Sequence, residues 1–223
     1  MPRIMCYDTE STGLPKRTLK APPTIADTID YPYVVQLSYI VYDTENHEVL
    51  KVYDQVIKIP ESAEIHPEAE KLHKITKELT QSEGISMKDA IAEFMHDFNS
   101  VDTIVGHNIQ FDNNIMLVEI LRNVTENFEW FHEITQCTRF SCTMLRSINL
   151  CAIKTCYKNS TKTYNKYPKL SELYHHLFQQ TPAKLHNSLN DVILCLQCYC
   201  MLEFNVNICF KNEQLAGLIH ATF

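Results

Sequence analysis

The feature that most constrains the fold is the order of apolar segments along the chain. Three runs rich in β-branched and aromatic residues come first, and they predict strands over 4–8, 34–42 and 48–59. The polar turn 43–46 fits a hairpin connection, so the three strands favour an antiparallel meander. Another short strand, 103–106, lies among segments with helical spacing. The pattern therefore predicts an α/β domain in which helices pack on one mixed sheet.

Helical spacing dominates the rest of the chain. Ser86 is a typical N-cap for a helix whose apolar face is formed by Ile91, Phe94, Met95 and Phe98. The other predicted helical segments are 66–77 (short turns), 112–122, 170–178 and the strongly apolar 188–204. The polar run 147–168 predicts a surface loop or a mobile lid. We expect one domain over 1–204, with the apolar-containing tail 205–223 docked on it.

Length and composition limit the class of protein. The chain has 223 residues, 45% of them apolar, which suits one packed domain. No apolar run reaches the roughly 18 residues of a membrane span, and the first residues do not resemble a secretory signal. We therefore expect an intracellular protein with no membrane partner, in either the cytoplasm or the nucleus.

Nine cysteines are expected to be thiols in that setting. Cys195, Cys198 and Cys200 fall in the apolar helical run, where cysteine acts as a small core residue. A zinc site formed by Cys137, Cys142, Cys151 and Cys156 is the alternative. These four lack the paired C-x₂-C spacing of zinc sites, so packing is the favoured interpretation.

Charge is distributed unevenly. The net charge of −7 argues at first against a nucleic-acid partner. Between Ile134 and Lys184, however, the only acid is Glu172, and eight residues are basic: Arg139, Arg146, Lys154, Lys158, Lys162, Lys166, Lys169 and Lys184. A smaller basic cluster consists of Lys16, Arg17 and Lys20. Such asymmetry fits a footprint for a phosphate backbone, although a solvated lysine-rich loop would look the same.

Three short motifs carry the chemistry. Asp8 and Glu10 lie two residues apart at the end of the first strand, so both carboxylates point to one face and can bind a hard divalent cation. Asp112 ends the second motif, which runs from Val105 and opens a helix. His186 and Asp191 form the third, just before and within the last long helix. Each motif alone has an ordinary structural explanation, such as a helix cap.

Together the motifs resemble those of the DEDDh family of 3′→5′ exonucleases, the proofreading and ribonuclease T type. The matching segments read D-T-E-S-T-G-L from Asp8, G-H-N-I-Q-F-D from Gly106 and H-N-S-L-N-D from His186. One departure is Ser188, where the family more often has alanine. The resemblance covers roughly residues 4–204 and implies a ribonuclease H-like fold, a mixed five-stranded sheet flanked by α-helices.

The resemblance also implies a mechanism. Asp8, Glu10 and Asp191 would bind one divalent cation, and Asp8 would bridge to a second that Asp112 supports. Mg²⁺ is the expected ion and Mn²⁺ a substitute. His186 would act as general base toward the attacking water, releasing nucleoside 5′-monophosphates from the 3′ end.

The same resemblance indicates which residues would hold the terminal nucleotide. They are Thr12 and Gly13 through backbone N–H and hydroxyl groups, Leu14 as a wedge against the base, and Asn108 and Phe111 as pocket walls. Core packing is the alternative for Leu14 and Phe111. The basic stretch 139–184 would follow the incoming strand.

The partner is therefore expected to be nucleic acid with a free 3′ end, single-stranded rather than duplex. DNA and RNA are not distinguished by any residue, so an exoribonuclease is the alternative activity. An inactive binding module is disfavoured because all five key residues are present. An interaction protein built on the cysteines and the tail is a further alternative, and a homodimer is left open.

Overall fold

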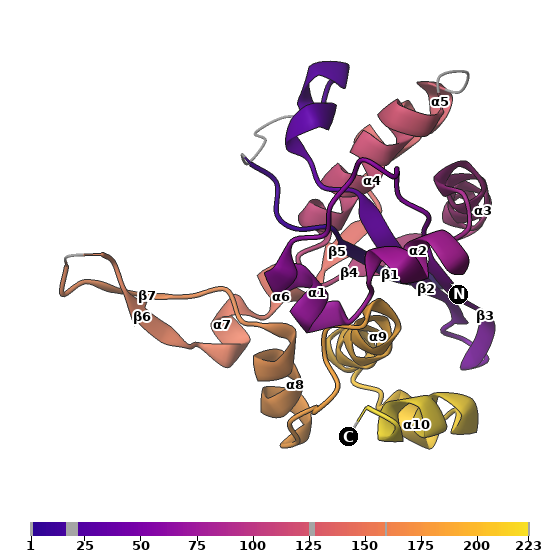
Figure 1. Cartoon of the computed structure of the whole chain (residues 1–223). Coiled ribbons are helices and arrows are strands. Elements are labelled where there is room, and N and C mark those ends of the chain that lie inside the picture. Colours follow the sequence, from indigo (N-terminus) through magenta and orange to yellow (C-terminus); the bar gives the residue numbers. More distant parts are fainter. Residues whose placement is uncertain (1, 17–21, 125–127, 159, 223) are drawn as a thin grey trace.

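The structure is a computed structural model, and its central element is a mixed five-stranded sheet (Figure 1). The structure describes residues 2–16, 22–124, 128–158 and 160–222. The strand order is β3-β2-β1-β4-β5. The pairs β1–β2 and β2–β3 are antiparallel, and the pairs β1–β4 and β4–β5 are parallel. The strands are β1 (Arg3–Ser11), β2 (Val34–Asp43), β3 (Glu48–Val56), β4 (Thr103–Gly106) and β5 (Phe140–Cys142). The predicted meander and mixed sheet are confirmed, whereas the sequence did not locate β5.

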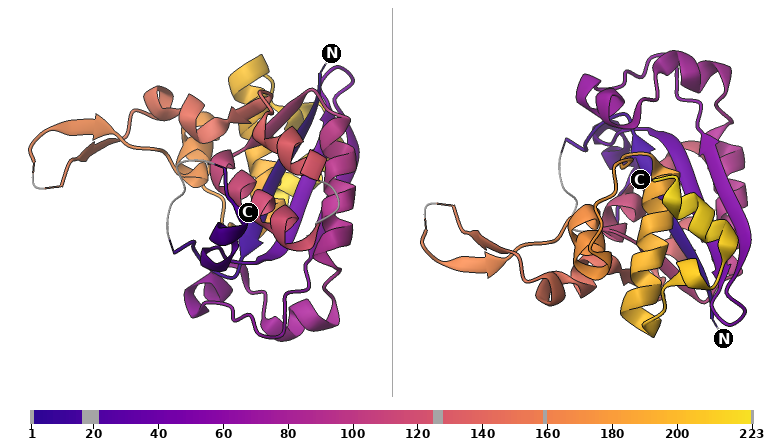
Figure 2. Two further views of the ribbon diagram at one scale, coloured as in Figure 1. Left: turned by 90° about the horizontal axis from the view of Figure 1, so that it is seen from above. Right: turned by 90° about the horizontal axis from the view of Figure 1, so that it is seen from below.

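One face of the sheet is covered by α9 (Ser188–Phe204) and α10 (Glu213–His220), as Figure 2 shows. Ile4 and Cys6 of β1 point to this face and pack with Val192 and Leu196 of α9. Leu215 and Ile219 of α10 are buried in the same cluster. This packing supports the proposal that residues 205–223 belong to the same domain as 1–204.

The opposite face is covered by α3 (Met87–Asn99) and α4 (Ile109–Asn123), with α5 (Phe128–Thr135) beside α4. Met5 and Tyr7 of β1 point to this side, where Tyr7 makes an edge contact with Phe94 at 5.0 Å between ring centroids. Ser86 caps α3 by accepting a hydrogen bond from the backbone N–H of Asp89, as its position predicted. Alternate residues of β1 therefore belong to different cores.

Shorter elements surround these layers. The 3₁₀ helix η1 (Ile25–Asp30) precedes β2. The helical turns predicted over 66–77 form as α1 (Pro67–His73), and α2 (Lys77–Ser82) begins where the predicted range ends. After β5 come α6 (Thr143–Arg146) and α7 (Ile148–Cys151), and α8 (Leu170–Phe178) packs against α9. The η2 turn (Ile208–Phe210) connects α9 with α10.

The segment 147–168 is not the loop that its polarity predicted. It contains α7 and an antiparallel pair, β6 (Lys154–Cys156) and β7 (Thr163–Asn165), which forms a separate two-stranded sheet. The strands have three residues each, too few to reveal an alternating pattern in a polar sequence. Figures 1 and 2 show this hairpin projecting from the body of the molecule.

Two other expectations concern membranes and charge. In the part of the chain that the structure describes, none of the helices has the length and apolarity needed to cross a membrane. Of the small basic cluster, Lys16 is described and lies 3.9 Å from Asp30, whereas Arg17 and Lys20 lie outside the described residues.

Candidate active site

Three carboxylates lie close together near the C-terminal end of β1. Asp8 and Glu10 continue the side of β1 that faces α9, since they alternate with Tyr7 and Thr9 on the opposite side. Asp191 lies in the first turn of α9, next to Val192 of the core. One ligand atom from each acid lies within 4.8 Å of the others, the only such group of three found among the described residues. The two-residue spacing on β1 thus brings the two carboxylates to one point, as predicted.

Asp112 approaches from the other side of the sheet. It lies in the first turn of α4 and is only 3% exposed. Its Oδ1 accepts hydrogen bonds from the backbone N–H of Thr9 at 3.0 Å and from the Thr9 hydroxyl at 2.7 Å. Asp112 therefore contacts β1 directly between Asp8 and Glu10, although it is not part of the three-carboxylate group.

Ionisation of all four acids is disfavoured in the metal-free protein. Burial is the largest cause and raises the pKa of Glu10 to about 8 and those of Asp112 and Asp191 to about 7. Burial also raises the pKa of Asp8, and the charges of Asp112, Asp191 and Glu10 add to that rise. Four carboxylates so arranged require protons or cations to balance their charge near neutral pH.

Asp191 supplies a direct test of whether a cation fits. Its Oδ2 accepts a hydrogen bond from the backbone N–H of His186 at 3.1 Å. Its Oδ1 is buried and has no hydrogen-bond partner. Buried acceptors are nearly always satisfied, so this oxygen, within reach of Asp8 and Glu10, fits a hard divalent cation.

His186 is held by its backbone rather than by its ring. The residue has a positive φ of 65° and an exposed side chain, and it directly precedes the α9 N-cap Asn187. Two N–H groups just before it, those of Ala183 and Lys184, donate to the carbonyl oxygen of Thr222 at 3.1 and 3.0 Å. The segment after α10 therefore anchors the loop that carries His186.

An open cavity of about 490 Å³ adjoins Glu10. Leu14 and Phe111, both predicted to bind the nucleotide, line it. Leu14 is 83% exposed, so the alternative that it packs in the core is wrong. Phe111 is partly buried and packs against the core while also facing the cavity. An aliphatic and an aromatic side chain thus flank an open space next to the carboxylates.

The opposite wall of this cavity was not found from the sequence. It comes from α1 and the residue before it, through His66, Glu68, Ala69, Leu72 and His73. Leu72 is 52% exposed, which is unusual for leucine. The His66–Pro67 pair marks a helix start, because proline is favoured in the first turn, but it does not indicate that the helix faces the site.

Thr12 has fewer groups available to bind a nucleotide than the resemblance implied, because two of them are hydrogen-bonded to Tyr33. The Thr12 N–H donates to the Tyr33 carbonyl at 2.8 Å, and its Oγ1 accepts from the Tyr33 N–H at 3.0 Å. Of the groups of Thr12 predicted to bind a ligand, the hydroxyl hydrogen is therefore the one left. Gly13 borders the cavity, and a Cβ there would lie 3.3 Å from the Cβ of His66.

Asn108 lies elsewhere. It caps α4 with a left-handed backbone (φ 65°) and lines a second open cavity of about 790 Å³, together with Arg146 and Tyr167. The structure thus separates Asn108 from the cavity that holds Leu14 and Phe111.

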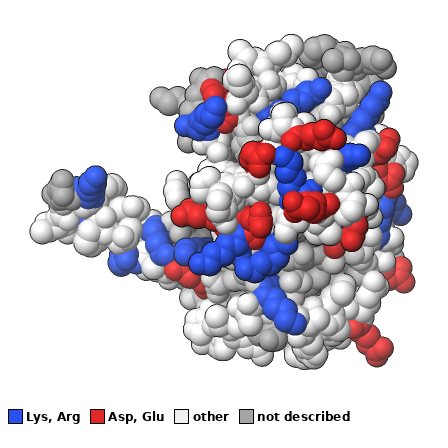
Figure 3. Space-filling view, in the orientation of Figure 1, with Lys and Arg blue, Asp and Glu red and all other residues white. Residues whose placement is uncertain are grey.

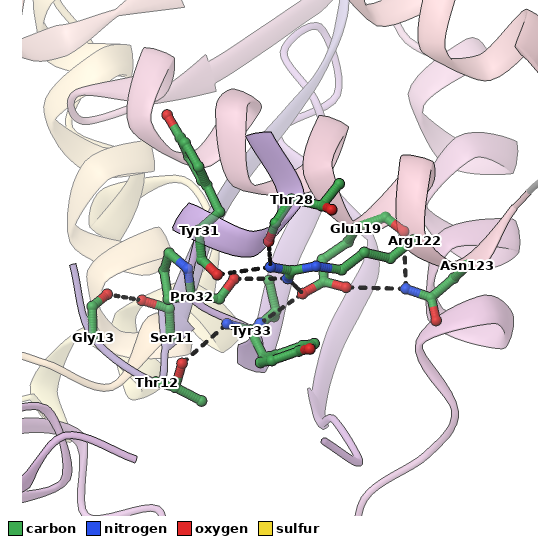
Figure 4. Close-up of polar contacts among 11 residues, drawn as sticks. Ser11, Thr12, Gly13, Thr28, Tyr31, Pro32, Tyr33, Glu119, Arg122 and Asn123 are labelled. Carbon is green, nitrogen blue, oxygen red and sulfur yellow. Dashed lines mark hydrogen bonds and ion pairs between the residues drawn. The ribbon is translucent and has the colours of Figure 1, made fainter. Parts of the chain in front are cut away.

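A buried ion pair on α4 is hydrogen-bonded to the segment 31–34, which lies beside the site (Figure 4). Glu119 is 2% exposed, and its Oε1 accepts from Arg122 at 2.8 Å and from the Val34 N–H at 3.1 Å. Arg122 also donates to the carbonyl oxygens of Pro32 at 2.9 Å and Tyr31 at 2.7 Å. Through Tyr33 this segment reaches Thr12, so the helix carrying Asp112 and the turn after Glu10 are joined.

Comparison with known proteins places this site in a family. Residues 5–199 match the RNase_T family, described as Exonuclease. The chain belongs to this exonuclease family. The match includes all five residues singled out by the motifs, from Asp8 to Asp191. No curated protein matches the chain.

Solved structures agree with the fold. Exonuclease I of E. coli in complex with a dA16 oligonucleotide has a TM-score of 0.60 at 15% identity, over 97% of this chain and 45% of that one. The zinc-bound form of an E. coli Exonuclease I complex with single-stranded DNA has a TM-score of 0.57 at 14% identity, over 98% and 43%.

Exonuclease X in complex with 5′-overhanging duplex DNA has a TM-score of 0.53 at 17% identity, over 97% of this chain and 99% of that one. The chain spans less than half of the Exonuclease I structures but nearly the whole of Exonuclease X. The likeness shows the ribonuclease H-like fold that the motifs implied.

Proposed function

We propose that this protein is a metal-dependent 3′→5′ exonuclease that releases nucleoside 5′-monophosphates from single-stranded DNA. The observation that carries the proposal is the grouping of Asp8, Glu10 and Asp191 next to an open cavity, together with the buried and unsatisfied Oδ1 of Asp191. Family membership supports the reaction class. The choice of DNA follows the DNA bound in the complexes of Exonuclease I and Exonuclease X.

The carboxylates divide into two sets by position. Asp8, Glu10 and Asp191 would hold one divalent cation, and Asp8 with Asp112 would support a second, with Mg²⁺ as the ion and Mn²⁺ as its substitute. Bound divalent cations supply two things in such a site: a lowered pKa for water, and charge neutralisation on the phosphate. The raised pKa values of these acids fit that role, since bound cations would favour the ionised carboxylates that burial disfavours.

His186 would accept the proton of the attacking water. Its side chain is exposed, its backbone N–H donates to Asp191, and the nearby Lys184 N–H donates to the Thr222 carbonyl. An imidazole is suited to this transfer near neutral pH. A loop anchored on both sides would limit the positions that the ring can take.

The cavity beside Glu10 would receive the terminal nucleotide. Leu14 and Phe111 offer apolar surface on one side, and Leu72 offers it on the other. A base between such side chains would be held by stacking and burial, which are tolerant of sequence.

A labelled-oligonucleotide digest tests this proposal. Matched DNA and RNA oligonucleotides, labelled at either the 3′ or the 5′ end, are incubated with the protein and Mg²⁺. We expect immediate release of labelled mononucleotide from the 3′-labelled DNA, a descending ladder from the 5′-labelled DNA, and no reaction in EDTA. Faster digestion of the RNA would assign the activity to an exoribonuclease instead.

Two variants identify the residues responsible. Asp8→Asn should abolish cleavage by removing a metal ligand, whereas His186→Ala should abolish it while leaving metal binding largely intact. Turnover by His186→Ala at the rate of the unaltered protein would refute the role of His186. If the unaltered protein cleaves none of the substrates in Mg²⁺ or Mn²⁺, the proposed exonuclease activity is refuted.

A further inference from the structure

The hairpin formed by β6 and β7 is the most unusual feature outside the active site. We call the described residues 152–158 and 160–168 the arm. It extends away from the sheet and its helices in every view (Figures 1 and 2). A two-stranded hairpin is only marginally stable in isolation and buries little apolar surface. The fold therefore gains little from the arm, which suggests that its exposed surface serves a partner.

The charge of the arm is entirely positive. From 148 to 171 the sequence contains no Asp or Glu. Lys154, Lys158 and Lys162 are exposed, and within the described part of the chain their side chains form no ion pair or hydrogen bond. Figure 3 shows Lys and Arg side chains along the arm and across the adjoining face of the body. A row of free ammonium groups on an acidic protein fits a polyanion.

The other basic residues of the stretch 139–184 are largely engaged. Arg139 donates to the carbonyl oxygens of Val101 and Phe98, and Arg146 pairs with Glu203. Lys166 pairs with Glu172 at 2.5 Å, and Lys184 donates to the Ala221 carbonyl at 2.7 Å. Among the described basic residues of this stretch, those whose side chains have no ion pair or hydrogen bond are Lys154, Lys158 and Lys162 of the arm and Lys169 directly after it.

The arm also presents aromatic surface. Tyr157 and Tyr164 lie on the same face of the hairpin, with ring centroids 4.4 Å apart. Their exposures are 55% and 38%. Tyr167, at the base of the arm, is 60% exposed and lines the cavity that also contains Asn108. Exposed tyrosines among lysines favour a partner that has both phosphates and unpaired bases.

The base of the arm is attached to the second motif. His107 donates from Nε2 to the Pro168 carbonyl at 3.0 Å, and its Nδ1 lies 2.9 Å from the Thr143 hydroxyl. Burial lowers the pKa of His107 to about 4, so the ring is neutral and keeps this pattern at physiological pH. His107 directly precedes Asn108 and the helix that carries Asp112, so the arm is positioned relative to the active site.

We infer that the arm binds the unpaired strand upstream of the 3′ end, with Lys154, Lys158 and Lys162 on its phosphates and Tyr157 and Tyr164 stacked on its bases. The inference rests on the proposed function. The arm would hold a strand whose end lies in the active site, so that long substrates bind better than short ones while the chemical step is unchanged.

The experiment compares the unaltered protein with three variants on two substrates, and a fourth variant, Tyr157→Phe/Tyr164→Phe, keeps the aromatic rings. Variants are Lys154→Ala/Lys158→Ala/Lys162→Ala, Tyr157→Ala/Tyr164→Ala, and a control, Lys58→Ala/Lys88→Ala/Lys211→Ala, which removes exposed lysines outside the arm. Substrates are a single-stranded oligonucleotide of about 16 nucleotides and the p-nitrophenyl ester of thymidine 5′-monophosphate, which cannot reach the arm. Fluorescence anisotropy with a labelled oligonucleotide in EDTA measures binding directly.

We expect the lysine variant to reduce the slope of log affinity against log salt by about two, because about 0.7 counterions are released per phosphate contact. The tyrosine variant should lower affinity by about 30-fold or more, because each of two stacked bases contributes about 5-fold or more, and Tyr157→Phe/Tyr164→Phe should retain the affinity. Both alanine variants should raise KM for the oligonucleotide and leave ester hydrolysis unchanged. The control should match the unaltered protein.

Oligonucleotide affinity and salt slope equal to those of the unaltered protein in both arm variants would overturn the inference. An equal loss of oligonucleotide affinity in the control variant would also overturn it, since lysines outside the arm would then contribute as much to binding as those of the arm. If the unaltered protein hydrolyses neither substrate, the proposed function fails, and the anisotropy measurement still decides whether the arm binds the strand.

Discussion

Replacing Arg122 tests how the site is supported. Arg122→Met removes the cation that faces Glu119, a carboxylate that is 2% exposed, together with the hydrogen bonds to Pro32 and Tyr31. Removing one partner of a buried ion pair costs about 3–5 kcal/mol, because a buried charge is left uncompensated. In a chain of 223 residues, each kcal/mol lowers Tm by about 2–4 °C, so we expect a fall of about 10 °C.

The loss should depend on pH. Burial raises the pKa of Glu119, while Arg122 and the Val34 N–H lower it, so the variant's pKa should rise further. A carboxyl whose folded pKa exceeds its unfolded value contributes stability at low pH that disappears as pH rises through the folded pKa. The variant's Tm should therefore fall less, relative to that of the unaltered protein, at pH 5 than at pH 8.

Thermal unfolding at both pH values, followed by circular dichroism, measures these changes. Glu119→Gln/Arg122→Met should recover part of the loss, because no buried charge is left and glutamine can still accept from Val34. Lys88→Met, an exposed lysine on α3, serves as the matched control and should change stability by less than about 0.5 kcal/mol. A Tm for Arg122→Met within the control's range, or an equal loss at both pH values, would refute this reasoning.

Three further predictions concern the site. Asp191→Asn should abolish turnover yet raise Tm in EDTA at pH 8 by a few degrees, because the ionised carboxylate destabilises the metal-free fold above its pKa of about 7. The gain should be clearly smaller at pH 5, because the penalty develops as pH rises from the unfolded pKa of about 4 to the folded pKa of about 7, and differential scanning fluorimetry would show the difference. Mg²⁺ at about 100 times its Kd should stabilise the unaltered protein by about 2.7 kcal/mol, and Asp191→Asn much less. A chain ending at Ala221 lacks the Thr222 carbonyl that anchors Lys184, so kcat should fall more than KM rises, because His186 loses its position; equal kcat would contradict this role.

Local patterns in the sequence were enough to predict the main strands and helices. The β-branched run of β2 and the capped, amphipathic α3 have strong periodic signals, and both elements form where predicted. The signal fails where elements are short: β5 and the strands of the arm have three residues each. Their pairing with neighbouring strands, rather than their own composition, makes them strands.

The site divides in the same way. Spacing by two on β1 determines that Asp8 and Glu10 share a face, because side chains alternate in any strand. The sequence gives no sign that α1 lines the adjoining cavity, that Thr12 is occupied by Tyr33, or that Asn108 lies in a different cavity. These facts depend on which surfaces meet, and residues far apart in sequence decide them.

By itself, then, the sequence determined the composition of a metal site and the side of β1 on which two of its acids lie. Only the tertiary structure brought Asp191 to them, because α9 buries Val192 against the same face of β1 that Cys6 presents. Only the tertiary structure also decided which basic residues are free for a partner, because ion pairs occupy Arg146 and Lys166 and leave Lys154, Lys158 and Lys162 exposed. Periodicity acts over a few residues, whereas burial of apolar surface selects the distant segments that come together.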